Sequence, residues 1–353
     1  MTPTSATTTS TGTSTEASPS IDMTAPGARG AVTLADVQAP VRGKLADVLH
    51  AMEEAVTRDV PLLAQAARHL LAMKGKMFRP TLVLLASETE GAPSGAAIVT
   101  AAVVEMVHLA TLVHDDAVDH SELRRGMPTI NSLFNDQISV IMGDFLYSTA
   151  LAQLVELNDM RPIRALVDAS TQMSVGELRQ LSTVSPLDFS EEDYEFLIRG
   201  KTASLMSAAC RVGAFCGAER HAEALARYGD SLGMAFQIID DLIDYTEATE
   251  TTGKPSGIDL REHKVTLPLI AALRTMSPAT RNRVQALFDA TEPAPDAVAE
   301  VAGIVSESGG LDYARRRGDE YADRAREALN ALPRTDARDA LGAAILYVVE
   351  RHS

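Results

Sequence analysis

The sequence is poor in residues that several classes of protein require. It has no tryptophan, 4% aromatic residues and only 2 cysteines in 353 residues. So few aromatic residues disfavour an aromatic-rich β architecture, whereas the abundant alanine suits close-packed helices. Cys210 and Cys216 provide neither a disulfide framework nor a metal-binding spacing. A reducing, cytoplasmic location is therefore expected.

Positive charge and long apolar runs are also scarce. Lys and Arg number 32 against 48 Asp and Glu, which gives a net charge of −16. A protein that binds the phosphate backbone of nucleic acid needs a broad basic surface, so no nucleic-acid partner is expected. The most apolar stretch, residues 96–113, contains Glu105 and His108. No transmembrane segment is predicted, because charged and polar residues interrupt this run.

The first 30 residues differ from the rest of the chain. Of the first 20 residues, 13 are Ser or Thr, with almost no apolar bulk among the others. Such a segment buries too little surface to offset its ordering entropy, so residues 1–30 are predicted to be a disordered tail. The segment has neither the apolar core of a secretory signal nor the arginines of a transit peptide. Residues 31–353 show one compositional regime and predict one domain.

From residue 33 onward the apolar residues follow a helical period. The predicted helices span residues 34–58, 61–73, 80–90, 96–119, 136–157, 161–181, 191–216, 220–245, 266–275 and 279–290, with three more between 296 and 351. Ser190 and Asp193 predict a capping pair at the start of one of them. No segment alternates convincingly with a period of two. The sequence therefore predicts an all-α, single-domain helical bundle.

Two aspartate clusters share one spacing, and each ends an apolar helix. The clusters are Asp115, Asp116 and Asp119, and Asp240, Asp241 and Asp244. On a helix the three carboxylates of each cluster lie on one patch, where their repulsion calls for a nearby cation. A solvated acidic face is the alternative for a single cluster. Two copies of the spacing, both growing out of buried segments, favour a shared metal site.

The ligand type indicates which metal the clusters bind. Carboxylates without neighbouring His or Cys suit Mg²⁺, with Mn²⁺ as a substitute, and do not suit zinc. Magnesium keeps water ligands and is held by a few carboxylates together with substrate phosphates. Two facing carboxylate patches therefore predict a polyphosphate substrate held through several metal ions.

Two pairs of basic residues stand near the first cluster. Lys76 and Arg79 belong to the segment GKMFRP, and Arg124 and Arg125 follow the cluster on a predicted loop. Guanidinium forks and ammonium groups suit phosphate oxygens. A solvated surface is the alternative for either pair taken alone.

Polar residues share helical stripes with the aspartates. His108 and Thr111 lie seven and four residues before Asp115. Gln237 lies three, four and seven residues before Asp240, Asp241 and Asp244, again on one stripe. A lone His on an apolar face is usually a satisfied core residue, but this stripe leads to the metal patch and favours a ligand role. In the predicted helix 191–216, Gly200 hints at a close approach or a local distortion.

Six segments together resemble the motifs of the trans-type isoprenyl diphosphate synthases, the polyprenyl synthetase family. They are GKMFRP, HLATLVHDDAVDHSELRRG, GDFLYS, RGKTASL, FQIIDDLIDYT and DLREHKVTLPL, and the match covers about residues 40 to 350. The resemblance implies a helical bundle around a deep central cavity, the isoprenoid synthase fold, usually as a homodimer. It also implies a Mg²⁺-dependent prenyltransferase that condenses isopentenyl diphosphate with an allylic diphosphate, farnesyl or geranylgeranyl diphosphate.

The resemblance also implies roles for individual residues. The first cluster would hold two Mg²⁺ ions on the allylic diphosphate, and the second, chiefly through Asp240, a third. The residues implied to bind isopentenyl diphosphate are Lys76, Arg79, His108 and Arg125. Those implied to grip the allylic diphosphate are Arg124, Lys201 and Lys254. Thr202 and Gln237 would face the developing carbocation with their oxygen dipoles.

In this family the residues five and four positions before the first motif help to set product length. Here they are Ala110 and Thr111, both small. Small residues imply an open channel and a long-chain product, roughly heptaprenyl to decaprenyl, for quinone side chains. The alternative is that both merely pack against a neighbouring helix and that a deeper residue, on the helix with Met142, Phe145 and Thr149, forms the floor.

Several competing functions remain open at this point. A geranylgeranyl or farnesyl diphosphate synthase of the same family would carry the same motifs. A terpene cyclase would not need the second phosphate site that GKMFRP and the arginine pair indicate. A non-catalytic subunit of a two-component synthase would usually lose its aspartate motifs, and both are complete here. For any of the synthases, release of an apolar product implies a transient contact with a membrane.

Overall fold

The computed structural model describes residues 31–57, 60–73, 75–181, 186–246 and 257–351. The described residues from Ala31 onward pack as one compact unit. The predicted tail, residues 1–30, and the predicted phosphate ligand Lys254 lie outside the described residues.

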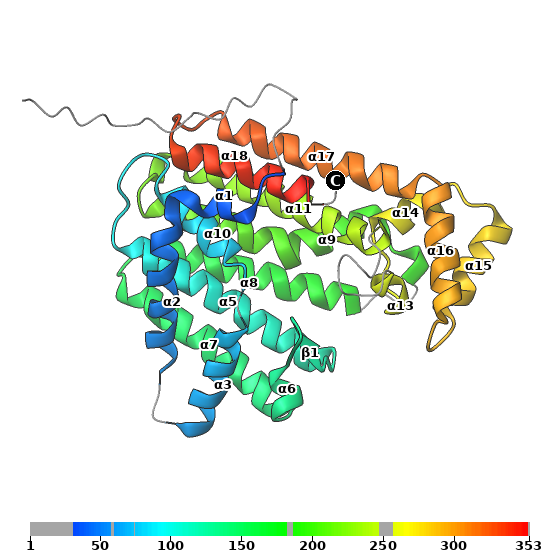
Figure 1. Cartoon of the computed structure of the whole chain (residues 1–353), viewed down its shortest axis with the longest axis horizontal. Helices are drawn as coiled ribbons and strands as arrows, with labels where there is room; N and C mark the ends of the chain where they lie inside the picture. The colour runs from blue at the N-terminus through cyan, green and yellow to red at the C-terminus, as the bar shows by residue number, and fades with distance from the viewer. Residues whose placement is uncertain (1–30, 58–59, 74, 182–185, 247–256, 352–353) are drawn as a thin grey trace, which may run out of the picture. The chain divides into compact units, whose positions relative to one another are not determined.

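Helices account for almost all of the described chain, so the all-α prediction is confirmed (Figure 1). In the first half these are α1 (Leu34–Gln38), η1 (Ala39–Val41), α2 (Arg42–Val56), α3 (Pro61–Ala72), α4 (Phe78–Ser87), α5 (Ala96–Val118), α6 (Ile130–Leu133), α7 (Asp136–Glu156) and α8 (Met160–Leu181). In the second half they are η2 (Pro186–Asp188), α9 (Glu191–Ile198), η3 (Arg199–Ala203), α10 (Ser204–Phe215), η4 (Glu219–His221), α11 (Ala222–Thr246), α13 (Ile258–Arg261), α14 (Leu267–Leu273), α15 (Pro278–Phe288), α16 (Pro295–Glu307), α17 (Gly310–Leu329) and α18 (Asp336–Val349).

Two predicted helices are interrupted in the structure. The predicted helix 34–58 is divided by the 3₁₀ turn η1, which has a proline in its first turn, because proline lacks the amide that a continuous helix needs. The predicted helix 191–216 contains the distorted turn η3. The capping pair is confirmed, since the hydroxyl of Ser190 accepts the amide of Asp193 at 3.1 Å and the Asp193 carboxylate accepts the amide of Ser190 at 3.2 Å.

A small antiparallel hairpin follows α5, although no strand was predicted from the sequence. Its strands are β1 (Leu123–Arg124) and β2 (Met127–Pro128). The two residues between them, Arg125 and Gly126, have φ angles of 52° and 75°. Two positive φ angles are what a two-residue type I′ hairpin turn requires. Strands of two residues are too short to show alternation, so sequence periodicity could not predict them.

Helix α5 is the central helix of the first half. It packs against α2, α4, α7 and α10, and its buried residues lie on all sides of the helix. By length and hydropathy α5 and α7 could each cross a membrane, but core helices pass the same test, and 67% of the apolar window of α5 is buried. In α7 only 39% of that window is buried, which leaves apolar surface on its outer face.

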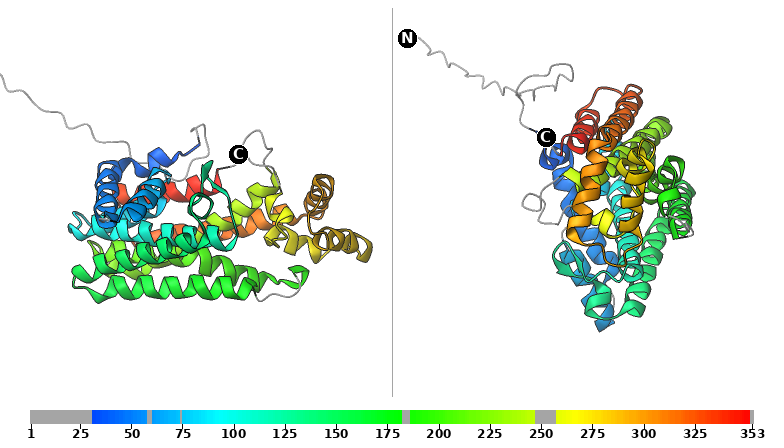
Figure 2. Two further views of the ribbon diagram at one scale, coloured as in Figure 1. Left: turned by 90° about the horizontal axis from the view of Figure 1, so that it is seen from below. Right: turned by 90° about the vertical axis from the view of Figure 1, so that its right-hand side faces the viewer.

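Helix α11 has the corresponding place in the second half. It packs against α10, α17 and α18, and the long helices run alongside one another (Figures 1 and 2). The hairpin of α15 and α16 stands at one end of this bundle. Because α5 and α11 are both held by neighbours along their length, the residues at their carboxyl ends have fixed positions.

The turn η3 is a π-helix that joins α9 to α10. The amide of Ser204 donates to the carbonyl of Arg199, five residues earlier, so this turn holds one residue more than an α-turn. A Cβ atom on Gly200 would lie 2.7 Å from the carbonyl oxygen of Gln172 in α8. Both sequence-based expectations for this glycine, a close approach and a local distortion, are thus met.

Replacing Gly200 with alanine is predicted to destabilise the protein. The added methyl would collide with the backbone of α8, and overpacking of this kind costs about 1–3 kcal/mol. The free energy of unfolding, measured by urea denaturation, should fall by that amount. The matched control is Gly303→Ala in α16, where a Cβ atom meets nothing within 4 Å. There the higher helix propensity of alanine should raise the stability by up to about 1 kcal/mol. Equal effects of the two substitutions would contradict the packing argument.

Candidate active site

The first aspartate cluster occupies the carboxyl end of α5. Asp115 and Asp116 lie in its last turn, and Asp119 is the C-cap residue. The carbonyl end of a helix carries partial negative charge, so carboxylates there are unfavourable unless a cation is close. Asp116 is buried, Asp115 is half-buried and Asp119 is exposed. The three side chains therefore have different surroundings despite their adjacency.

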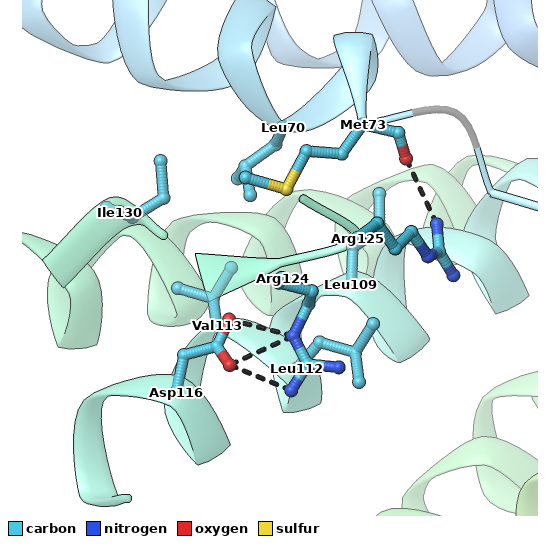
Figure 3. Close-up of a pocket in the computed structure, with 9 residues that line it drawn as sticks. All are labelled: Leu70, Met73, Leu109, Leu112, Val113, Asp116, Arg124, Arg125 and Ile130. Atoms are coloured by element: carbon cyan, nitrogen blue, oxygen red, sulfur yellow. Dashed lines mark hydrogen bonds and ion pairs between the residues drawn. The ribbon is translucent and has the colours of Figure 1, made fainter. Parts of the chain in front are cut away.

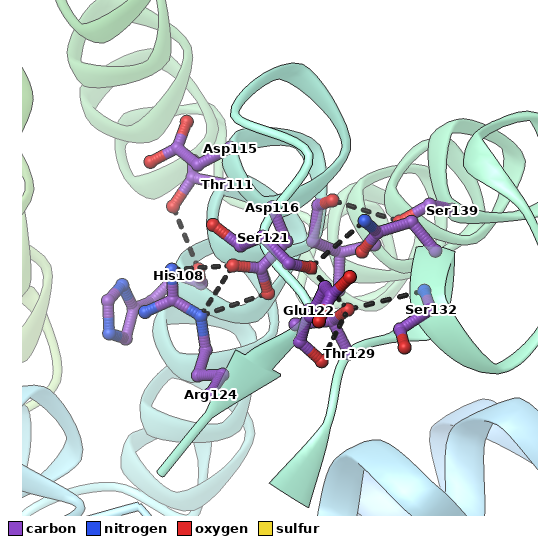
Figure 4. Close-up of polar contacts among 12 residues, drawn as sticks. His108, Thr111, Asp115, Asp116, Ser121, Glu122, Arg124, Thr129, Ser132 and Ser139 are labelled. Carbon is purple, nitrogen blue, oxygen red and sulfur yellow. Dashed lines mark hydrogen bonds and ion pairs between the residues drawn. The ribbon is translucent and has the colours of Figure 1, made fainter. Parts of the chain in front are cut away.

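Asp116 is bound to an arginine that was itself predicted to be a site residue. The Nε atom of Arg124, on β1, lies 2.9 Å from each carboxylate oxygen, and its Nη2 atom lies 2.8 Å from Oδ1 (Figure 4). Both oxygens of Asp116 are thus engaged by one guanidinium. This contact orients Arg124 and leaves Asp116 less open to a metal than its two neighbours.

The hairpin that carries Arg124 and Arg125 is anchored to the end of α5. The hydroxyl of Thr129 and the amide of Asn131 both donate to the carbonyl of Ser121, at 2.7 and 3.0 Å (Figure 4). Because the turn is tight and anchored, the two arginines follow the aspartates at a defined place. The sequence predicted a loop here, and the structure replaces it with an ordered hairpin.

A small cavity lies beneath this hairpin, between α3, α5 and α6. It is lined by Leu70, Met73, Leu109, Leu112, Val113, Asp116, Arg124, Arg125 and Ile130 (Figure 3). Its volume is about 10 Å³, which is room for a water-sized molecule. The cavity is therefore a packing gap under the arginines and has no room for a prenyl chain.

Lys201 faces Asp115 from the π-turn η3. Its Nζ atom lies 3.6 Å from Oδ2 of Asp115 and also forms an ion pair with Glu177 of α8. Burial raises the pKa of Asp115, and the charge of Lys201 opposes this increase. Sequence reasoning predicted Lys201 and missed Glu177, which carries no motif signature. The extra residue in η3 sets the direction in which Lys201 points.

The second cluster occupies the last two turns of α11, and only one of its three members is open. Asp240 is exposed, whereas Asp241 is 7% exposed. The carboxylate of Asp244 accepts the backbone amides of Ile258 and Asp259, at 3.1 and 3.0 Å. Asp244 thus ties the first turn of α13 to α11.

A chain of hydrogen bonds connects η3 to the second cluster. The hydroxyl of Thr202 donates to Oε1 of Gln237 at 2.8 Å, and Nε2 of Gln237 donates to Asp241 at 2.8 Å. Tyr194 of α9 donates to the other oxygen of Asp241 at 2.6 Å. Burial raises the pKa of Asp241, and the nearby Asp259 carboxylate adds to this effect. Thr202 and Gln237 thus lie together in the structure, and the hydrogen-bond chain includes Tyr194, which sequence reasoning missed.

The two clusters face a common region. Burial lowers the pKa of Lys264, but Glu262, Asp259 and Asp119 raise it, and the net result is an increased pKa. The ammonium group of Lys264 therefore interacts both with the carboxylates of Asp259 and Glu262 and with that of Asp119 at the end of α5. The π-turn η3 also contacts both helix ends, because Lys201 lies 3.6 Å from Asp115 of α5 and the next residue, Thr202, donates to Gln237 of α11.

Arg351, after α18, is a site residue that sequence reasoning missed. Its Nη2 atom lies 3.0 Å from Oδ1 of Asp240, and its guanidinium stacks 4.5 Å from the ring centroid of Phe236. Phe236 in turn stacks on Phe78 at 6.1 Å, and Phe78 contacts Tyr347 of α18 at 5.9 Å. No local pattern in the sequence links a residue so close to the C-terminus to the second cluster. The link arises only from tertiary packing.

On the other side of α5, Arg79 and His108 form a contact between α4 and α5. Nη1 of Arg79 lies 3.0 Å from Nε2 of His108. Burial lowers the pKa of His108 well below its usual value, and the neighbouring charges of Arg79, Arg125 and Arg124 lower it further. A guanidinium can only donate, so His108 is neutral, accepts through Nε2 and carries its proton on Nδ1. Lys76 is exposed, and its backbone carbonyl accepts a hydrogen bond from Gln38 at 2.9 Å.

The two residues predicted to set product length have different positions. Ala110 is 2% exposed and belongs to the core. Thr111 is half-buried, and its hydroxyl donates to the carbonyl of His108 at 2.8 Å (Figure 4). Of the deeper candidates on α7, Met142 and Thr149 are buried, and Phe145 is partly buried against the core.

The donor set fits a metal that is shared with a substrate. Within the described residues, no three acidic, histidine or cysteine side chains converge closely enough to form a metal site of their own. Asp115, Asp119 and Asp240 nevertheless offer oxygen ligands at two negatively polarised helix ends. Magnesium typically takes only a few protein carboxylates and completes its shell with water and phosphate oxygens.

Comparison with known proteins identifies the family. The profile of the family described as polyprenyl synthetase matches residues 60–305. An all-trans-nonaprenyl-diphosphate synthase (geranyl-diphosphate specific) of Rhodobacter capsulatus is 38% identical over 308 residues, covering 87% of this chain and 94% of that protein.

Solved structures agree with this match. A decaprenyl diphosphate synthase from Rhodobacter capsulatus superimposes with a TM-score of 0.85 at 35% identity, covering 90% of this chain and 99% of that one. A polyprenyl synthase from Caulobacter crescentus CB15, in complex with calcium and isoprenyl diphosphate, gives a TM-score of 0.86 at 35% identity and covers 92% of this chain and 100% of that one. The resemblance drawn from the motifs is confirmed, and the chain belongs to the polyprenyl synthetase family of prenyltransferases.

Proposed function

We propose that this enzyme adds isopentenyl diphosphate units, head to tail with trans geometry, to an allylic diphosphate and makes a long-chain polyprenyl diphosphate. The product is roughly heptaprenyl to decaprenyl and serves as a quinone side chain. The observation that carries the proposal is the arrangement on α5, where the neutral His108, bonded to Arg79, lies two turns before the aspartates at the helix end. One rigid helix thus separates a basic diphosphate site from an acidic one. Relatives named for nonaprenyl and decaprenyl products support the chain length.

The metal is Mg²⁺, about three ions per active site, with Mn²⁺ as a substitute. Asp115 and Asp119 would hold ions at the end of α5, and Asp240 would hold one at the end of α11. When bound, such ions neutralise the leaving diphosphate and so favour its departure. The contacts of Asp116, Asp241 and Asp244 give these three a further task, since they orient Arg124, Gln237 and the first turn of α13.

The remaining residues bind and orient the two substrates. Lys76, Arg79, His108 and Arg125 would hold isopentenyl diphosphate, and Arg124, Lys201 and Lys254 the allylic diphosphate. The allylic C–O bond breaks and its electron pair leaves with the diphosphate. The isopentenyl double bond then attacks the allylic carbon, and a proton passes to the released diphosphate. Thr202 and Gln237 stabilise the positive carbon with their oxygen dipoles.

The allylic substrate is farnesyl or geranylgeranyl diphosphate, and the enzyme acts in the cytoplasm with a transient membrane contact for product release. Purified protein would be incubated with Mg²⁺, each allylic diphosphate and labelled isopentenyl diphosphate, and the dephosphorylated products separated by reversed-phase chromatography. A ladder of products well beyond geranylgeraniol is expected. A product that stops at geranylgeraniol would overturn the long-chain assignment, and no incorporation with any primer would overturn the activity.

Loss of Asp115 or Asp240 is predicted to abolish most of the activity while the fold survives. Asp115→Ala and Asp240→Ala should each lower kcat by at least about 100-fold, because each removes charge stabilisation of the leaving group. Steady-state kinetics and helical circular dichroism would be measured side by side. Asp319→Ala, at an exposed position in the middle of α17, is the control and should retain full activity. Near-normal turnover in either site variant would refute the metal assignment.

Bulky residues at positions 110 and 111 are predicted to shorten the product. Thr111→Phe, and Ala110→Phe combined with Thr111→Phe, should each shift the ladder toward shorter alcohols on reversed-phase chromatography. Ala110 is buried, so the double variant also overpacks the core by about 1–3 kcal/mol. The single variant at the half-buried Thr111 separates a blocked channel from a damaged fold. An unchanged ladder in a folded Thr111→Phe enzyme would contradict the prediction.

A homodimer is the proposed assembly, and α7 and α8 are the proposed interface. Their outward side chains form an apolar surface made by Val140, Ile141, Val155, Met160, Val167, Val175 and Leu178, which are 40% to 72% exposed. Exposed apolar side chains that recur along two successive helices indicate an interaction site. A second copy of the same face is the occupant, because closed twofold symmetry lets one patch cover its own copy.

Charges on this surface are predicted to separate the subunits. Ile141→Glu combined with Leu178→Glu should convert a dimer of the wild-type chain into a monomer, measured by light scattering coupled to size-exclusion chromatography. Burying two carboxylates per subunit in an apolar interface is unfavourable. Ala286→Glu, an exposed position on α15, adds charge elsewhere and should leave the dimer intact. A wild-type monomer, or a variant that stays dimeric, would contradict the proposed interface.

A further inference from the structure

Glu105 is a buried carboxylate that the proposed chemistry does not use. It lies on α5, one turn before His108, and only 5% of it is exposed. In the sequence it appears only as an interruption of the most apolar stretch. Among the described residues, its Oε2 atom is buried and has no hydrogen-bond partner. Because an unsatisfied buried carboxylate is costly, its presence in a core helix calls for an explanation.

The charges around Glu105 come from two residues of the proposed isopentenyl diphosphate site. Burial raises the pKa of Glu105, while the guanidinium groups of Arg79 and Arg125 lower it. In the opposite sense, burial lowers the pKa of Arg79, and Glu105 raises it. The Nε atom of Arg79 is likewise buried without a hydrogen-bond partner in the described part of the chain. Within the residues that the structure describes, Glu105 thus has an unpaired acceptor atom and Arg79 an unpaired donor atom, and the charges of these two residues influence each other.

Gly75 is the point where these groups meet. A Cβ atom built on it would lie 3.0 Å from Nη1 of Arg125 and 3.3 Å from Oε1 of Glu105. The same Nη1 atom donates to the carbonyl of Met73 at 3.0 Å. The glycine of the GKMFRP segment therefore leaves room for a guanidinium from the hairpin and a carboxylate from α5. The three segments that supply the basic site converge on Glu105.

We propose that Glu105 is a positioning residue for isopentenyl diphosphate. Its carboxylate keeps Arg79 and Arg125 oriented toward the diphosphate, and it accepts the Nε–H of Arg79 while that guanidinium holds the phosphate. Without this acceptor, two guanidinium groups close together repel each other and turn apart. The inference rests on the proposed function, which assigns isopentenyl diphosphate to these two arginines.

Two simple alternatives predict different outcomes. If only net charge mattered, removing a carboxylate would make the site more positive, and a diphosphate would bind more tightly. If Glu105 served only to stabilise the fold, its loss would lower stability without distinguishing between the two substrates. A positioning role instead predicts weaker binding of isopentenyl diphosphate alone.

The experiment measures KM for each substrate separately in Glu105→Gln. The KM for isopentenyl diphosphate should rise by about 10- to 100-fold, the effect of losing a hydrogen bond to a charged group, while the KM for the allylic diphosphate changes less than about twofold. Glu105→Asp keeps the charge and should restore part of the affinity. The control Thr100→Val alters another buried polar residue of α5 and should leave both KM values unchanged. Titration calorimetry with isopentenyl diphosphate alone would check that KM reports binding.

A second comparison tests the partner residues. In an Arg125→Gln background, Glu105→Gln should cost much less affinity than in the wild-type chain, because one of the two charges that the carboxylate balances is already gone. An unchanged or lower KM for isopentenyl diphosphate in a folded Glu105→Gln enzyme would overturn the inference. If Arg79→Ala and Arg125→Gln also left this KM unchanged, or the wild-type enzyme condensed nothing, the proposed function itself would fail.

Discussion

Mutual repulsion of carboxylates at the carboxyl ends of two helices is the constraint on which this site depends. Helix dipoles make those ends unfavourable for negative charge, and partial burial increases the cost. Basic residues from three other segments pair with these carboxylates. Arg124 from the hairpin binds Asp116, Lys201 from η3 faces Asp115, and Arg351 after α18 binds Asp240. The site is therefore a balance of charges in which a metal and a diphosphate can replace some of the protein's own partners.

Helix α5 separates the basic region of the site from the acidic region. Its buried middle carries Glu105 and His108 beside the arginines, and its end carries the first aspartate cluster. Because neighbours surround α5 along its length, the separation between the basic and acidic regions does not depend on flexible loops. Catalysis that works by positioning and charge stabilisation needs a fixed separation of this kind.

The sequence was sufficient to predict the helices and the ends where the aspartates lie, because period and spacing are local properties. The family resemblance grouped Thr202 with Gln237, and Arg79 with His108, by the group they would contact, and the structure adds that each pair is joined by a hydrogen bond. Partners from distant segments could not be predicted. Glu177, Tyr194 and Arg351 have no distinctive local pattern, and only packing places them at the site. The engagement of Asp116 and Asp244 by protein donors likewise depends on the hairpin and on the four-residue helix α13, which periodicity does not detect.

The π-turn η3 restricts where the chain can lose a single residue and still form the site. A turn with one extra residue could be converted to a regular helix by deleting any residue of Arg199–Ala203. Because a π-turn fits its extra residue into one turn, such a deletion would leave α9 and α10 in register but would change the directions in which the side chains of this turn project. Lys201 and Thr202, both within this turn, could then no longer reach Asp115 and Gln237 together. Single-residue deletions should therefore be tolerated far less well here than in the surface hairpin of α15 and α16, even though they would make the helix more regular.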